Sequence, residues 1–168
     1  MTPSTEALPA EAAAAAPGPR SGRYLTDRRL GALLCVAASL GDLVVFQQNL
    51  ANGLAVSLPF LAAAVVQLVL AWRVWASPRT AEALSAVLVL GLLIGLQAVA
   101  VRSGATTVGP REEPLRADVP ATAALFLRLA ALPCLVRALS GRGRSWAVDG
   151  LLVIGAVVWT LRLTGLLG

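Results

Sequence analysis

Asp42 is the only acidic residue well inside one of the long apolar segments of this 168-residue chain. An isolated ionised group in hydrocarbon is costly, so such a residue usually pairs with an opposite charge or lines a water-filled path. Arg128, in a later apolar segment, offers the opposite charge. At a rise of about 1.5 Å per residue, Asp42 lies about 18 Å from the start of its segment. Arg128 lies about 12 Å from the opposite boundary, so the two depths coincide in a core of ~30 Å. We therefore predict an Asp42–Arg128 pair, which either fixes helix order or forms a proton-relay or ion site.

Three amides and one further arginine complete a predicted polar site inside the apolar segments: Gln47, Gln67, Gln97 and Arg162. Interhelical hydrogen bonds of this kind contribute about 0.6 kcal/mol each, which suffices for packing specificity. Packing is thus one interpretation of these residues. The alternative is a polar cavity lined by Gln47, Gln97 and Arg162.

The segments that carry these residues are long enough to cross a membrane. A helix needs about 20 apolar residues to span ~30 Å of hydrocarbon. The chain is 57% hydrophobic and 14% charged, whereas soluble domains average about 45–50% apolar and about 25% charged residues. We predict an all-α bundle of five membrane-spanning helices in a domain covering residues 30–168, with spans at about 30–50, 54–76, 83–101, 119–139 and 146–167.

Residues 1–29 precede the first span and consist of an Ala/Pro-rich run followed by arginines. Such a run has too little apolar bulk to fold alone, so we expect a disordered cytoplasmic tail with a basic flank. We expect the first span to be a retained anchor rather than a cleaved leader, because it is long enough to cross the bilayer by itself.

The arginines determine the predicted orientation. All 14 basic residues are arginine, a composition that suggests a bacterial chain. Cytoplasmic segments of membrane proteins carry the excess of basic residues. With the N-terminus inside and the C-terminus outside, nine arginines lie on the cytoplasmic side and three outside. The nine are Arg20, Arg23, Arg28, Arg29, Arg73, Arg79, Arg137, Arg142 and Arg144, and the three are Arg102, Arg111 and Arg116.

The absence of particular residues excludes several kinds of chemistry. The chain has no His, and its single Met is Met1, so His- or Met-ligated haem and His-containing zinc sites are excluded. Nucleic-acid binding is disfavoured, because the arginines are scattered between apolar segments. Cys35 and Cys134 do not form a Cys-x-x-Cys motif and are interpreted as buried thiols. We predict no catalytic, cofactor-binding or metal-binding residues and no cofactor.

Gly91 and Gly95 form a small-xxx-small motif in the third span. Such motifs let helix backbones approach closely. The motif favours packing within the chain, and a homo-oligomer through these glycines is the alternative.

These features predict a multi-pass protein of the inner (plasma) membrane. Its expected partners are the lipid bilayer and another membrane protein. The first functional hypothesis is a non-catalytic accessory subunit of a larger complex. The second is a small solute or ion transporter that uses the Asp42–Arg128 pair. An enzyme acting on a lipid or isoprenoid is the third, and the missing acid–base and metal residues count against it.

Overall fold

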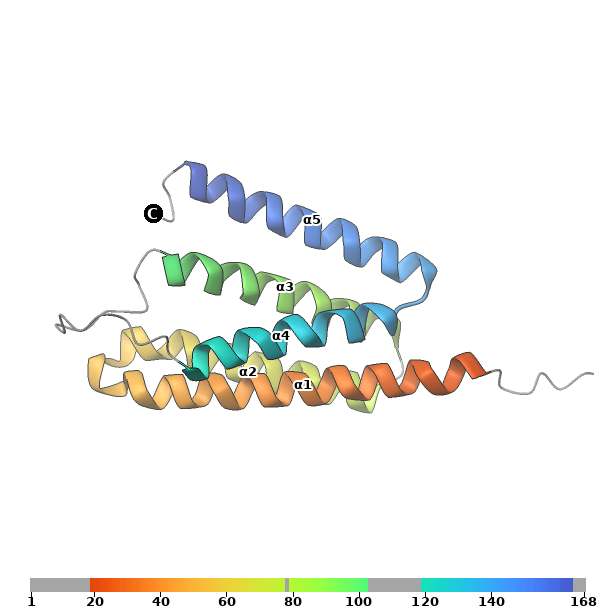
Figure 1. The fold of residues 1–168 in the computed structure, drawn as a ribbon, viewed down its shortest axis with the longest axis horizontal. Helices are drawn as coiled ribbons and strands as arrows, with labels where there is room; N and C mark the ends of the chain where they lie inside the picture. Colours follow the sequence, from red (N-terminus) through yellow and green to blue (C-terminus); the bar gives the residue numbers. More distant parts are fainter. Residues whose placement is uncertain (1–18, 78, 103–118, 165–168) are drawn as a thin grey trace, which may run out of the picture.

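All regular structure in the described residues of the computed structural model is helical (Figure 1). The structure describes residues 19–77, 79–102 and 119–164. Five α-helices and one short 3-10 helix follow each other along the chain: α1 Pro19–Asn49, η1 Leu50–Asn52, α2 Leu54–Ala76, α3 Thr80–Arg102, α4 Val119–Arg137 and α5 Gly141–Leu163. All five α-helices are long and apolar enough to cross a membrane, which indicates a membrane protein.

The helices form a layered bundle in which α5 is peripheral (Figure 1). Helix α1 packs extensively against α2 and α4, and these three helices form the most closely packed part of the molecule. Helix α3 joins this part to α5, which contacts α4 only slightly. The buried polar residues of α1, α2 and α4 therefore lie in the part of the bundle that neighbouring helices cover most, whereas Ala147 is the one buried residue among those described on α5.

The observed helices extend the predicted spans mainly at one end of the bundle. This end, here called the basic end, is where α1, α3 and α5 begin and where α2 and α4 end. Helix α2 has the predicted bounds, but α1 begins at Pro19 rather than near residue 30, and α5 begins at Gly141 rather than near residue 146. Hydropathy detects only the apolar part of a helix, and these helices continue past it into arginine-rich sequence. Residues 19–29 are thus helical, while the predicted tail up to residue 18 lies outside the described residues.

The α1–α2 connection is a tight hairpin that depends on a glycine. Helix α1 runs into η1, and Gly53 then takes a φ of 106°, the one positive φ among the described residues. Residues that carry a side chain rarely adopt a positive φ, whereas glycine does so without a steric penalty. The Ser57 hydroxyl donates to the Gly53 carbonyl at 3.1 Å and so satisfies one backbone group of the turn.

Small residues on one stripe of each helix allow the helices to approach closely. On α1 the buried positions recur every three or four residues, at Arg28, Ala32, Cys35, Ser39 and Asp42. A similar stripe on α4 consists of Ala124, Arg128, Ala131 and Leu135. This spacing keeps the same helix face toward its neighbours. The polar residues therefore lie among alanines, on faces that pack against other helices.

Close helix approaches occur at glycines. A Cβ atom placed on Gly41 of α1 would lie 3.0 Å from the Ala124 Cβ and 3.3 Å from the Pro120 carbonyl oxygen, both on α4. On α3, Gly91 faces Leu151 and Gly95 faces Val158, both on α5 of the same chain. The glycine motif thus packs within the chain, and a homo-oligomer through Gly91 and Gly95 stays a prediction.

Candidate functional site

Asp42 and Arg128 form a buried ion pair between α1 and α4. The Arg128 Nη2 atom donates to Asp42 Oδ2, and each residue is only 3% exposed. This is the pair predicted from the matching depths of the two residues. Two charges removed from water in this way require excellent geometry and further hydrogen bonds to offset their desolvation.

Gln67 of α2 supplies further hydrogen bonds to both members of the pair. Its Nε2 donates to Asp42 Oδ2 at 2.6 Å and to the Ala63 carbonyl at 3.2 Å. Its Oε1 accepts from Arg128 Nε at 3.4 Å. One fully buried amide therefore uses its donor side on the carboxylate and its acceptor side on the guanidinium.

Gln97 extends the network to a fourth helix. Its Oε1 accepts from Arg128 Nη1, and its Nε2 donates to the Ala121 carbonyl of α4 at 2.9 Å. The side chains of Asp42, Gln67, Gln97 and Arg128, here called the polar network, thus connect α1, α2, α3 and α4. Because α1–α4 each contribute one residue, the network fixes the relative depth of all four helices.

Two residues of the predicted polar site lie apart from this network. Gln47 follows Asp42 by five positions and is exposed. Five residues at about 100° per residue rotate a side chain by about 140° around the helix, which takes Gln47 off the buried stripe. Arg162 lies on α5, and its side chain falls outside the described residues.

The polar network has few means to carry out acid–base or metal chemistry. Its carboxylate is occupied by a guanidinium and an amide. Nowhere in the described ranges do three His, Cys, Asp or Glu residues gather as they would around a metal ion. The described groove at the surface lies at the basic end and is lined by Gly22, Arg23, Thr26, Asp27 and Arg137, none of which belongs to the network. The polar groups of the network therefore connect helices and are occupied by one another and by helix carbonyls.

A second buried cation, Arg28, was absent from the predicted site. It is 4% exposed, and its Nε donates to the Val74 carbonyl of α2 at 2.7 Å. Its Nη2 is buried without a hydrogen-bond partner. The sequence did contain a signal for this burial, since Arg28 lies on the same α1 stripe as Asp42.

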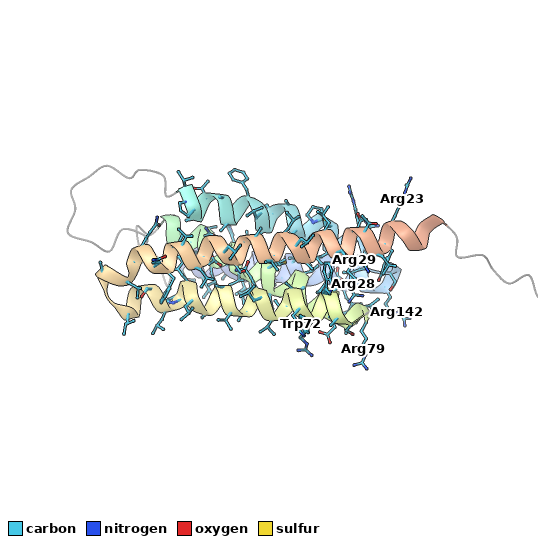
Figure 2. The ribbon with its side chains drawn as sticks, turned by 90° about the horizontal axis from the view of Figure 1, so that it is seen from below. Arg23, Arg28, Arg29, Trp72, Arg79 and Arg142 are labelled. Atoms are coloured by element: carbon cyan, nitrogen blue, oxygen red, sulfur yellow. The ribbon has the colours of Figure 1, made fainter. Side chains whose placement is uncertain are left out.

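The neighbouring arginine makes a parallel contact with the same end of α2. The Arg29 guanidinium lies over the Trp75 ring, 5.5 Å from its centroid. Consecutive arginines of α1 thus meet consecutive residues of α2, with Arg28 on Val74 and Arg29 on Trp75. Figure 2 shows Arg28 and Arg29 together with Arg23, Arg79 and Arg142 at the basic end of the bundle.

Comparisons with known protein families, with curated proteins and with solved structures found no match for this chain.

Proposed function

We propose that this chain is a non-catalytic accessory subunit of a larger complex in the inner (plasma) membrane. The observation that carries this proposal is that the buried polar groups of the network bond to one another and to helix carbonyls. A transport or proton-relay site needs groups that can exchange partners with a substrate or with water. A network whose members are occupied instead fixes one helix arrangement, as a scaffold requires.

The peripheral position of α5 supports an interaction with another membrane protein. This helix contributes least to packing within the chain and contacts mainly α3. Its far side presents large exposed apolar residues, among them Leu152 and Val153. Helices of different membrane subunits associate through van der Waals packing of such uncovered faces, which replaces their contacts with lipid.

The proposed orientation places the basic end in the cytoplasm. Eight arginine side chains are described there, and cytoplasmic segments carry such an excess. Three exposed tryptophans, Trp72, Trp75 and Trp146, lie near this end of their helices, as residues at a membrane–water interface do.

Site-specific photo-cross-linking in native membranes tests the accessory role. A photoreactive residue at Leu152 or Val153 of α5 is expected to capture one membrane protein that also copurifies after mild detergent extraction. Matched probes at the exposed Leu58 and Val69 of α2 are expected to capture mainly lipid. Equal protein capture from both helices, or none from α5, would contradict the proposal.

A small transporter is the alternative, and it requires a different property. Water must reach Asp42 from at least one side of the membrane for a substrate or proton to exchange there. Accessibility measurements beside Asp42 therefore separate the two functions.

A further inference from the structure

Among the described arginines of the basic end, Arg28 is buried and has an incomplete set of hydrogen-bond partners. Eight described arginines surround this end, and all except Arg28 are exposed: Arg23, Arg29, Arg73, Arg79, Arg137, Arg142 and Arg144. Two carboxylates lie close to the helix ends here, and one of them, Glu82, pairs with Arg73 at 3.1 Å. The other, Asp27, lines the surface groove beside Arg23 and Arg137. The ion pairs among the described residues are Arg73–Glu82 and Arg128–Asp42, so Arg28 has no carboxylate within ion-pair distance in this part of the chain.

The geometry of Arg28 leaves one donor available for a ligand. Its Nε caps α2 by donating to the carbonyl of Val74, in the last turn, where carbonyls lack partners within the helix. Its Nη2 is buried and unpartnered. The next stripe residues on α1, Ala32 and Cys35, offer it no carboxylate or carbonyl side chain. A buried charged donor of this kind is costly unless an acceptor satisfies it.

The residues around Arg28 combine cations with aromatic and apolar surface. Arg29 stacks on Trp75, and Trp72, one turn earlier on α2, is 71% exposed. Further along α1 toward the bundle centre, Leu33 is exposed as well. Arginines above an aromatic and apolar helix surface match the headgroup and upper acyl region of a lipid. Figure 2 shows Trp72 on the outer side of α2, at the same end as the labelled arginines.

We propose that the junction of α1 and α2 at the basic end binds an anionic glycerophospholipid through its phosphate group. Arg28 Nη2 donates to a phosphate oxygen while Nε keeps its bond to Val74, and Arg29 supplies a second positive charge. The fork of a guanidinium suits this use, because its N–H groups can serve a carbonyl and a phosphate at once. Because Nη2 is covered in the structure, binding requires the side chains over it to shift outward while the guanidinium stays on Val74. The lipid's acyl chains then lie along the exposed surfaces of Trp72 and Leu33.

This inference rests on the proposed membrane insertion but not on the accessory role. It is tested on the purified full chain without any partner protein. A failure of the lipid experiment therefore leaves the cross-linking experiment unaffected, and the reverse also holds.

The experiment compares lipid retention by native mass spectrometry in mild detergent. The probes are phosphatidylglycerol, phosphatidylcholine with the same acyl chains, and inorganic phosphate as a competitor. The wild-type chain is expected to retain phosphatidylglycerol in preference to phosphatidylcholine. Arg28→Gln is expected to lower the phosphatidylglycerol affinity about tenfold, as befits a lost charge-assisted hydrogen bond. The matched control Arg79→Gln removes the same charge from an exposed position at the same end and is expected to lower it less than about threefold.

A third variant covers the case in which Arg28→Gln does not fold because the cap on α2 is lost. Arg28→Lys keeps the charge, but its compact ammonium lacks the fork that serves Val74 and the phosphate together. It is expected to fold and to bind phosphatidylglycerol more weakly than the wild type. Wild-type affinity in Arg28→Lys would overturn the proposal.

Three other results would also overturn it: no preference for phosphatidylglycerol, equal losses in Arg28→Gln and Arg79→Gln, or displacement of the lipid by an equal concentration of inorganic phosphate. The last result would assign the site to a free anion. Retention of the lipid in the presence of inorganic phosphate would show that the bound phosphate group belongs to the lipid.

Discussion

Neutralising Asp42 is expected to destabilise the protein more than neutralising Arg128. In Asp42→Asn, the buried guanidinium of Arg128 keeps only neutral partners, the Gln67 and Gln97 oxygens. A guanidinium stays charged under all ordinary conditions, so the charge remains in the apolar interior. In Arg128→Gln, the carboxylate keeps its bond from Gln67 at 2.6 Å and can lose its charge by taking up a proton.

The magnitude follows from the burial of both side chains, each residue being 3% exposed. Breaking one side of a buried ion pair costs about 3–5 kcal/mol. We expect about 4 kcal/mol for Asp42→Asn and about 3 kcal/mol for Arg128→Gln. The double variant buries no unpaired charge, so its loss is expected to be smaller than the sum by about 2 kcal/mol. An ordinary interhelical hydrogen bond in a membrane contributes only about 0.6 kcal/mol, so a coupling of this size indicates an ion pair.

The assay is reversible unfolding in mixed micelles, followed by tryptophan fluorescence for the wild type, both single variants and the double variant. Far-ultraviolet circular dichroism controls for the helical content of each purified variant. If the double variant loses as much stability as the two single losses added together, or if the coupling stays near 0.6 kcal/mol, the ion-pair reasoning is wrong.

Three other substitutions test the helix packing. Gln97→Leu and Gly41→Ala are each compared with a control variant, and Gly91→Leu is compared with the wild type. Gln97→Leu is expected to cost about 1 kcal/mol, because two interhelical hydrogen bonds are lost, while Gln47→Leu at an exposed position should stay within about 0.5 kcal/mol in the same unfolding assay. Equal effects would contradict the assignment of Gln97 to the network. Gly41→Ala is expected to lose about 1–2 kcal/mol, since the added methyl group meets rigid atoms of α4. Gly155→Ala meets nothing within 4 Å and should be neutral or gain about 0.5 kcal/mol of helix propensity; the reverse order would refute the close α1–α4 approach. Gly91→Leu is expected to push α5 from α3 and to accelerate tryptic cleavage at the start of α5, and an unchanged cleavage rate would show that the helix pair tolerates the extra volume.

The helices of this fold were largely predictable because each is marked by a long apolar segment. Helix α2 has the predicted bounds, and α4 begins at Val119 as expected. The starts of α1, α3 and α5 were placed too late, since the apolar part of each helix begins after the helix itself and hydropathy follows only the apolar part. Helix propensity could not correct these starts, because arginine is a good helix former both inside and outside the apolar segment and so does not mark where the helix begins.

The contacts of the site could be predicted where they depend on the depth of a residue in its helix. They could not be predicted where they depend on which helices are neighbours. Asp42 and Arg128 were matched from their distances to the span ends. Gln67 and Gln97 were predicted as members of the polar site, but their hydrogen-bond partners were not. These partners depend on which helices are neighbours, and the glycine and alanine contacts that decide this are not ordered by the sequence. The burial of Arg28 and the exposure of Gln47 were readable from the α1 stripe, since one lies on it and the other lies off it.

A closed and dry polar network leaves no water path to Asp42, and cysteine labelling beside Asp42 in native membranes measures whether such a path exists. Ser39, one turn away on the same stripe, is fully buried, whereas Ser145 at the basic end is exposed. In a background in which Cys35 and Cys134 are replaced by alanine, Ser39→Cys and Ser145→Cys are treated with a water-soluble thiol reagent from each side of the membrane. The closed network predicts that the cysteine at position 145 reacts and that the one at position 39 stays unlabelled from both sides. Rapid labelling at position 39 would demonstrate a water path to Asp42 and would contradict the account in favour of a transport site.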